Sequence, residues 1–451
     1  MPPGGLASLL GIQGSSMRLE MASFAVRDVR FATKTRLEDG VLYVDREELR
    51  VLILEGGDFE DVGLEIVHPG ESVRLIHVMD AVEPRFKPGS GSSFPAFVGP
   101  LKTVGGGRTH RLEGMAIVSV GEPAAGEPTY WREAIVEMSG PGMDATPFGA
   151  TINLVLDFKP GRQYLDAEHA DAVVRNLMIG SELAQRYNRA VRVAELKTAV
   201  YLSRVTESME PERVQVYDST VVDPSLPKVV YFFQIGGMHA YGENIERGHN
   251  VFPIMLHPNE VLDGALINTL SNVNSYHKYP TFLLQNHAVI RNLYARHGTD
   301  LNFAGVIIYP RGPNDLIEKD MISDQAVKMA KQLGAQGACS SYWGSGHSCV
   351  EFMYICQKCE QAGIKVVQLL PEGMDSAEGP GIVYYVPEAV AVISTGRIAH
   401  GIRLPAVEKV IGGKEMFPFP GPPVDAREIT YRHLYACSTS SGYGRLTAKE
   451  Y

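Results

Sequence analysis

The chain has 451 residues, 45% hydrophobic and 21% charged, which is ordinary for a globular protein and excludes a disordered or collagen-like chain. Its formal net charge of −10 argues against a general nucleic-acid binder, because phosphate contact needs a basic face. No apolar run approaches the roughly 20 residues that cross a bilayer, so we expect no membrane-embedded function.

The N-terminus shows no export signal, because the apolar residues 6–12 follow no positive charge. A more regular pattern begins at Met17, so we expect residues 1–16 to be a disordered or non-native extension. The chain has five cysteines, an odd number that does not indicate a disulfide framework. We therefore expect a cytoplasmic protein.

The segment from residue 17 to about residue 160 reads as a β-rich N-terminal domain of the α+β type. Asp39-Gly40 precedes the apolar run 41–44, and this combination is a hairpin signal. The runs 50–54, 115–118 and 134–136 are also strand-like, and glycines bound them.

From residue 161 to residue 451 the pattern alternates between strands and helices. Apolar runs predict strands at residues 229–233, 303–309, 364–369 and 389–393. Helical spacing is found at residues 166–187, 323–333 and 350–362, and Gly334 and Gly363 stand where the last two helices should end. This alternation predicts a three-layer α/β domain with a mainly parallel sheet. The fold class of the whole chain is therefore α/β.

Two glycine-rich loops are candidates for a shared site. In residues 105–110, Arg108 is predicted to hold a substrate carboxylate, Thr109 to bind substrate and His110 to act as acid or base near neutral pH. In residues 138–149, Asp144 is a candidate catalytic carboxylate and Ser139 a candidate substrate-binding residue. The alternative is that both stretches are ordinary turns, with Asp144 bonded to its own backbone.

The cysteine-rich stretch offers two further candidates. Cys356 and Cys359 form a C-x-x-C pair inside a predicted helix, where packing as small hydrophobes is favoured over a redox or zinc role. His347, which we assign to substrate binding, and Cys349 stand where a strand passes into a helix. Free N–H groups there lower a thiol pKa, although Ser345 or Ser348 could simply cap the helix.

Several short motifs occur in collinear order, at residues 17–20, 39–44, 69–74, 107–110, 138–142, 263–265, 294–298, 330–335 and 446–448. Together they resemble one known family, the component B alpha and beta subunit proprotein of glycine, sarcosine and betaine reductases. The resemblance covers nearly the whole chain from Met17.

This resemblance implies a specific chemistry. Members of the family cut themselves before a cysteine, which becomes an N-terminal pyruvoyl group that forms a Schiff base with the substrate amine. A selenocysteine on a partner subunit then displaces the amine, and further proteins complete the reduction. An electrophilic group of this kind makes nitrogen a better leaving group.

The sequence departs from the family at the cleavage slot, near residues 268–276. Asp263-Gly264-Ala265 matches the family, but Leu270-Ser271 stands where the family has Asn-Cys. A serine hydroxyl can support the same reaction, so we predict a pyruvoyl group derived from Ser271, with Ser275 as second candidate. The alternatives are an uncleaved, pyruvoyl-free subunit that binds a partner, or a metal-using lyase with His110, Asp144, His347 and Cys349 as ligands. We predict no metal.

The resemblance implies an oxidoreductase subunit that binds a small amine or quaternary-ammonium acid for reductive C–N cleavage, in the glycine, sarcosine, betaine or D-proline reductase group. The implied partner is a component B subunit that carries a selenocysteine or cysteine nucleophile. We also expect an oligomer.

A chain that begins at Met17 is expected to fold as the full chain does, because residues 1–16 have no apolar periodicity that would tie them into a fold. Thermal unfolding of the two chains should give the same melting temperature. A large drop for the shorter chain would contradict this prediction.

Overall fold

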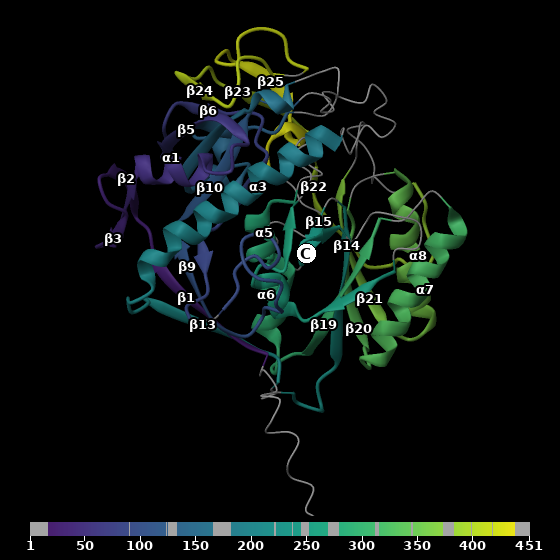
Figure 1. Cartoon of the computed structure of the whole chain (residues 1–451). Coiled ribbons are helices and arrows are strands. Elements are labelled where there is room, and N and C mark those ends of the chain that lie inside the picture. Colours follow the sequence, from purple (N-terminus) through teal and green to yellow (C-terminus); the bar gives the residue numbers. More distant parts are fainter. Residues whose placement is uncertain are drawn as a thin grey trace, which may run out of the picture.

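The computed structural model describes residues 17–89, 91–122, 124, 133–165, 182–220, 222–236, 238–244, 252–268, 279–311, 315–343, 346–372, 383–397, 399–416 and 418–437. These residues form β-sheets flanked by helices, so the α/β class predicted from the sequence is confirmed (Figure 1). Met17 is tied to the body of the protein, because its carbonyl accepts a hydrogen bond from the Asn259 side chain at 2.6 Å. Within the described ranges no helix is long and apolar enough to cross a membrane.

Small sheets dominate the N-terminal half. Their orders are β13–β1–β9–β8, β5–β12–β10–β7, β2–β4–β3 and β11–β6–β24. The strands are β1 (Arg18–Ala25), β2 (Asp28–Ala32), β3 (Arg36–Glu38), β4 (Val41–Asp45), β5 (Phe59–Val67), β6 (Val73–Leu75), β7 (Asp80–Val82), β8 (Arg85–Phe86), β9 (Gly107–Glu113), β10 (Met115–Gly121), β11 (Val136–Glu137), β12 (Ile152–Pro160), β13 (Arg213–Asp218) and β24 (Lys409–Ile411).

The structure confirms one local prediction and corrects another. Asp39 and Gly40 both have positive φ and join β3 to β4 as an antiparallel hairpin. Residues 50–54, predicted as a strand, instead end helix α1 (Arg46–Leu54). The Asp45 side chain accepts from the Glu48 N–H and caps this helix, and Leu49 and Ile53 bury one face at helical spacing.

Helix α3 (Glu182–Ser203) crosses the β-rich half and packs on β7, β8 and β10. The following strand β13 pairs with β1, and the late strand β24 pairs with β6. These pairings cross the boundary predicted near residue 160. The division into two domains at this boundary stays a prediction.

The predicted mainly parallel sheet is present and has the order β17–β19–β14–β20–β21–β22. Every pairing is parallel except that of β17 with β19. The strands are β14 (Lys228–Ile235), β17 (Ile254–Leu256), β19 (Asn302–Pro310), β20 (Gly337–Ser341), β21 (Lys365–Glu372) and β22 (Val392–Arg397). Smaller sheets add β15 (Met238–Ala240), β16 (Glu243–Asn244) and β18 (Leu266–Asn268), and β23 (Gly401–Leu404) with β25 (Arg427–Thr430).

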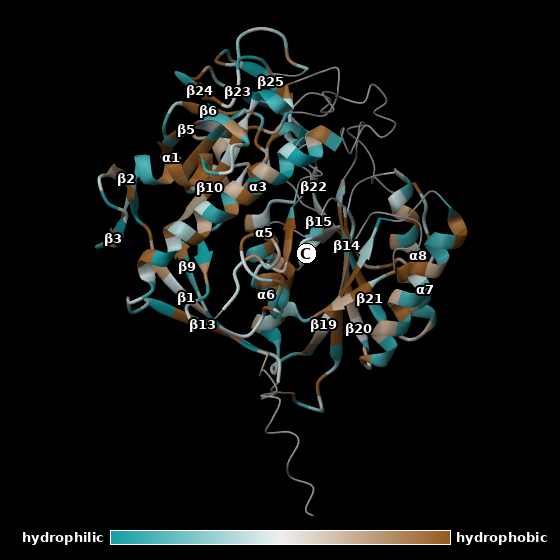
Figure 2. Ribbon diagram, in the orientation of Figure 1, coloured by the Kyte–Doolittle hydropathy of each residue, from teal (hydrophilic) through white to brown (hydrophobic). Residues whose placement is uncertain are grey.

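Helices cover both faces of this sheet, which explains why β14 is apolar at every position from Val230 to Phe233. Val230 and Phe232 pack under α7 (Leu316–Gln332) and α8 (Cys349–Gln361). Tyr231 and Phe233 pack in the core that includes α5 (Thr281–Gln285) and α6 (Ala288–Arg296). In Figure 2 the strands of the sheet are largely brown, which marks hydrophobic residues. Hydrophilic residues, in teal, lie on the outer turns of α7 and α8.

The core beneath α5 and α6 joins the two halves of the molecule. It contains Leu19 and Met21 of β1 together with Tyr231 and Phe233 of β14. Figure 1 shows α5 and α6 between the β-rich half and the six-stranded sheet. Side chains from both halves therefore meet around these two short helices.

Two carboxylates of neighbouring strands, Asp157 on β12 and Asp61 on β5, have opposite pKa shifts. Burial raises the pKa of Asp157 to about 6, with Glu122 and Glu65 adding to the effect against Lys159. The Arg50 guanidinium, 2.8 Å from Asp61, lowers the pKa of Asp61. Between about pH 4 and 6 the unfolded chain releases the Asp157 proton that the folded chain retains. The free energy of unfolding therefore falls as pH rises through this window.

Asp157→Asn is expected to raise the free energy of unfolding at pH 7.5 by about 1–2 kcal/mol, a discounted value for a side chain that solvent partly reaches. At pH 4 the variant and the wild type should be equally stable, because Asp157 is then protonated. Asp61→Asn serves as the control and should lower stability at pH 7.5. Chemical denaturation at both pH values checks this. A destabilised Asp157→Asn variant at pH 7.5 would contradict it.

Candidate functional site

A buried carboxylate, Asp80 of β7, joins two segments that flank residues 269–278. Asp80 Oδ2 accepts a hydrogen bond from Thr281 Oγ1 at 2.6 Å, and Oδ1 accepts from the Thr281 N–H at 3.0 Å. Thr281 Oγ1 in turn accepts from the Asn268 N–H at 3.1 Å. Asn268 ends β18 and Thr281 begins α5, so one carboxylate holds both flanks of the predicted cleavage region.

Charged groups of α3 surround Asp80 on its other side. The charge of Arg192 acts to lower the pKa of Asp80, but burial outweighs it and raises that pKa. Burial, reinforced by the Asp80 carboxylate, also raises the pKa of Glu195 well above its usual range, although Ser119 Oγ donates to Glu195 at 2.8 Å. The two buried carboxyl groups share one arginine, Arg192, whose charge acts to lower the pKa of both against the effect of burial.

His287 lies beside this junction and remains neutral. It is fully buried, edge-on to the rings of Tyr231 and Phe233. Its Nε2 lies 3.4 Å from the hydroxyl oxygens of Tyr231 and Tyr279. Burial lowers the pKa of His287 to about 3, so this imidazole does not donate a proton as a cation at neutral pH.

Helix α5 is held at its second end by another polar network. The Glu83 N–H donates to Gln285 Oε1 at 2.9 Å, and Gln285 Nε2 donates to the Glu83 carbonyl at 3.2 Å. Arg85 donates to Glu83 Oε2 at 2.6 Å and to the Leu262 carbonyl at 2.6 Å. Asp80 and Glu83 therefore fix the two ends of α5 from the same short stretch of chain.

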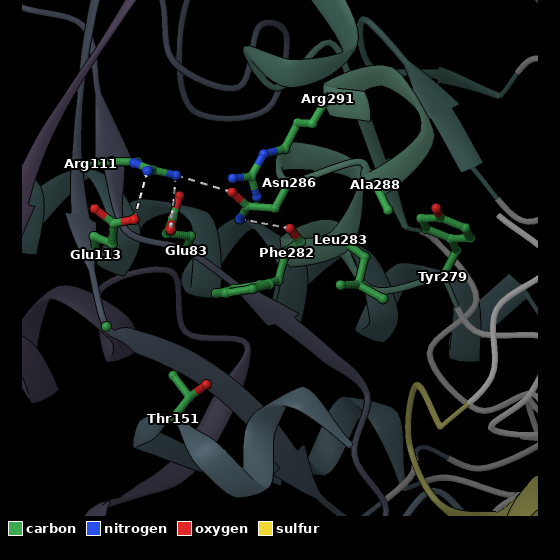
Figure 3. Close-up of a pocket in the computed structure, with 11 residues that line it drawn as sticks. Glu83, Arg111, Glu113, Thr151, Tyr279, Phe282, Leu283, Asn286, Ala288 and Arg291 are labelled. Carbon is green, nitrogen blue, oxygen red and sulfur yellow. Dashed lines mark hydrogen bonds and ion pairs between the residues drawn. The ribbon is translucent and has the colours of Figure 1, made fainter. Parts of the chain in front are cut away.

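One pocket lies against α5 and α6 and has a volume of about 230 Å³. The β-rich half contributes Glu83, Arg111, Glu113, Gly114 and Thr151, and the second half contributes Tyr279, Phe282, Leu283, Asn286, Ala288 and Arg291. Figure 3 shows the charged residues grouped at one end and Tyr279 at the other, with the apolar side chains between them. The volume is below the roughly 300–1,000 Å³ of pockets for drug-sized ligands, and suits a small molecule.

The first predicted loop lies elsewhere and is held by structural contacts. Arg108 donates to Glu20 at 2.8 Å, and Thr109 Oγ1 donates to the buried Asp263 at 2.6 Å. His110 Nδ1 lies 3.0 Å from Thr206 Oγ1. The His110 ring packs against Phe24 and Phe86, and burial, with the charge of Arg108, lowers its pKa. Thr109 therefore anchors the loop to the start of the matched Asp263-Gly264-Ala265 segment.

The second predicted loop packs against the C-terminal part of the chain. Ser139 precedes helix α2 (Gly140–Met143), which packs on β23, and Asp144 follows that helix exposed to solvent. Among the described residues no hydrogen bond joins this loop to residues 105–110. Contacts therefore do not support the shared site that we predicted for the two loops, and the roles of Arg108, Thr109, His110, Ser139 and Asp144 stay predictions.

His347 and Cys349, near the start of α8, lie in different environments. His347 is exposed, whereas Cys349 is buried with its thiol 3.2 Å from the Tyr384 carbonyl. Burial raises the pKa of Cys349, so the expectation of a lowered thiol pKa at this helix start is wrong. Cys356 and Cys359 are buried in the core under α8, as the packing interpretation expected. The described residues contain no cluster of three His, Cys, Asp or Glu side chains that could hold a metal.

The predicted catalytic residue Ser271 and its alternative Ser275 lie outside the described residues. Sequence reasoning missed Asp80, Glu195 and His287. Two features could have indicated these buried charged residues. Asp80 is a single carboxylate within the apolar run 78–82, and Arg192 and Glu195 lie on the buried face of a helix.

Residues 17–419 match the family described as glycine/sarcosine/betaine reductase component B subunits. The chain is 33% identical over 459 residues to a "Glycine reductase complex component B subunits alpha and beta" protein of Peptoclostridium acidaminophilum, covering 96% of this chain and 100% of that one. The protein of the same name from Acetoanaerobium sticklandii is 31% identical at equal coverage. The "Sarcosine reductase complex component B subunit alpha" of P. acidaminophilum is 34% identical, covering 88% of this chain and 89% of that one. No solved structure matches.

Asp80→Asn is expected to lower the free energy of unfolding by about 3 kcal/mol, because it removes the charge that balances Arg192 and an acceptor for Thr281. Limited proteolysis should then cut faster between residues 268 and 281. Glu137→Gln is the matched control, since Glu137 is a buried carboxylate paired with Arg74 elsewhere in the fold. It should lower stability similarly without faster cutting between residues 268 and 281. Equal proteolysis of the two variants there would contradict the assignment.

Proposed function

The chain belongs to the family of glycine/sarcosine/betaine reductase component B subunits, and from this membership we propose that it is the substrate-binding subunit of a reductase complex. In this proposal the complex cleaves a C–N bond of a small amine or quaternary-ammonium acid. The partner is a component B subunit that supplies a selenocysteine or cysteine nucleophile. The five free thiols of this chain are compatible with the cytoplasm as the proposed location.

The observation that carries the proposal is the Asp80 junction. The family match over residues 17–419 includes both sides of residues 269–278. Asp80 accepts a hydrogen bond from Thr281, whose hydroxyl accepts from the Asn268 N–H. Self-cleavage within a segment requires that the peptide on each side be held, so that the attacking hydroxyl keeps its geometry. The buried Asp80 carboxylate accepts hydrogen bonds from Thr281 and, at 3.3 Å, from the Tyr435 O–H. These bonds hold the two flanks of the segment in place.

The proposed maturation starts with attack of the Ser271 hydroxyl on the Leu270 carbonyl carbon. The amide C–N bond breaks and an ester forms. Elimination then releases residues 1–270 with a C-terminal carboxylate and leaves dehydroalanine at position 271. Its enamine tautomerises to an imine, and one water replaces the nitrogen, which leaves as ammonia. The pyruvoyl carbonyl that results would supply an electrophile for a substrate amine.

A second candidate function is an uncleaved subunit that binds its partner without a pyruvoyl group. The observation that favours it is Leu270-Ser271 at the cleavage slot, which lacks the cysteine and the preceding asparagine that the family resemblance implies. The two functions differ in one measurable property, the covalent state of the purified chain.

The mass spectrum of the wild-type protein, purified with its partner subunits, is expected to show residues 1–270 and a pyruvoyl-headed 271–451. Ser271→Ala should remain one uncut chain and fail to react with hydrazines, because alanine has no hydroxyl to attack the preceding carbonyl. Ser275→Ala is the matched control and should be cut as the wild type is. A wild-type chain that stays uncut would favour the second candidate, and cutting that depends on Ser275 would move the site there.

A further inference from the structure

The lining of the pocket of about 230 Å³ at α5 and α6 includes two carboxylates, Glu83 and Glu113, and two arginines, Arg111 and Arg291. Arg85 pairs with Glu83 at 2.5 Å, and Arg111 and Arg213 pair with Glu113 at 2.8 and 2.7 Å. Arg111 and Arg213 together lower the pKa of Glu113 despite the opposing effect of burial, so this carboxylate is charged at neutral pH. Both acidic groups of the pocket are therefore neutralised by arginines that do not include Arg291.

Arg291 is the cation left over. Its side chain is exposed to solvent and lines the pocket from α6, and its guanidinium forms no ion pair or hydrogen bond within the described part of the chain. Figure 3 shows its guanidinium directed toward Asn286, beside Arg111. The side-chain oxygen of Asn286, Oδ1, already accepts from Arg85 at 3.1 Å and from Arg111 at 3.2 Å. The guanidinium of Arg291 is thus available to a ligand, in a position where other arginines also favour an anion.

The far end of the pocket has a different character. Phe282, Leu283 and Ala288 line its middle, and Tyr279 closes the end opposite the arginines (Figure 3). A ligand that fits this shape has one anionic group and a short, compact remainder. A larger acid would not fit the volume, and a dianion such as phosphate would leave the apolar middle unused.

We propose that this pocket binds a small amino acid by its carboxylate, which Arg291 holds in a two-pronged hydrogen bond, with the amine end directed toward Tyr279. The inference rests on the proposed function for the identity of the ligand class, but not for the site itself. Tyr279 lines the end of the pocket opposite the arginines and is therefore the residue that the amine end would approach.

Isothermal titration of the full chain with glycine, sarcosine and betaine tests this, with methylamine and tetramethylammonium as cations that lack a carboxylate. The wild type should bind at least one of the three acids and neither cation. Arg291→Gln should weaken binding of that acid about 10-fold or more, because a hydrogen bond between charged groups is lost. Arg296→Gln is the matched control, since Arg296 lies on the same helix and pairs with Asp300 at 2.9 Å. It should bind as the wild type does.

A second variant, Ala288→Phe, fills the middle of the pocket and should abolish binding while the melting temperature stays within the wild-type range. Binding that survives Arg291→Gln or Ala288→Phe would overturn the proposal, as would a wild type that binds none of the three acids. The Ser271→Ala chain distinguishes the pocket proposal from the pyruvoyl proposal. If it binds the acid through Arg291 although the wild type is never cleaved, the pocket stands and the pyruvoyl proposal fails.

Discussion

The hydrogen bonds of Asp80 are the constraint on which the site depends. A buried carboxylate is costly unless it is paired and hydrogen-bonded. Besides the N–H of the neighbouring Ala81, which donates to Asp80 Oδ1 at 2.8 Å, Asp80 relies on residues that lie far from it in sequence. Thr281 is 201 positions away and Tyr435 is 355 positions away. Arg192 of α3 adds the compensating charge. Satisfying this one group therefore brings together the β-rich half, the long helix, the start of α5 and the C-terminal part of the chain.

The same short stretch of chain that carries Asp80 also shapes the pocket. Asp80 bonds to the start of α5 and Glu83 to its end, so the side chains of Phe282 and Leu283 line the pocket from a helix that is anchored at both ends. A five-residue helix would not be stable alone, because helix nucleation costs more than so few hydrogen bonds return. Its order is supplied by the polar groups at its two ends, which couples the cleavage region to the ligand pocket through one rigid element.

The sequence predicted the parts of the fold that depend on local patterns. The Asp39-Gly40 hairpin, the strands β14, β19 and β21 and the helix ends at Gly334 and Gly363 follow from turn chemistry and apolar periodicity. Strand β20 was not predicted, and β22 begins at Val392 rather than at residue 389. Residues 50–54 were misassigned because a run of four apolar residues, 51–54, suits a strand or a buried helix equally. The capping aspartate at position 45 was the signal that decided for the helix.

The site was less predictable, because its residues acquire their roles only through distant contacts. Loops 105–110 and 138–149 were predicted to form a site because they are rich in glycine. In the structure Arg108, Thr109 and His110 contact Glu20, Asp263 and Thr206, and Asp144 is exposed to solvent. Arg291 looks in the sequence like any arginine on the exposed face of a helix. Only the pairing of the other arginines with Glu83 and Glu113 shows that its charge is unused.

Hydrogen exchange at the Asn268 amide tests most directly whether Asp80 holds this region together, because that N–H donates to the Thr281 hydroxyl, which donates to Asp80. Thr281→Val keeps the shape of the side chain and removes the bridge, and Thr109→Val removes an equivalent hydroxyl that donates to Asp263 at 2.6 Å. If Asp80 holds this region through Thr281, exchange at Asn268 accelerates about 10-fold or more in Thr281→Val and is unchanged in Thr109→Val. Equal exchange at Asn268 in wild type and Thr281→Val would contradict it.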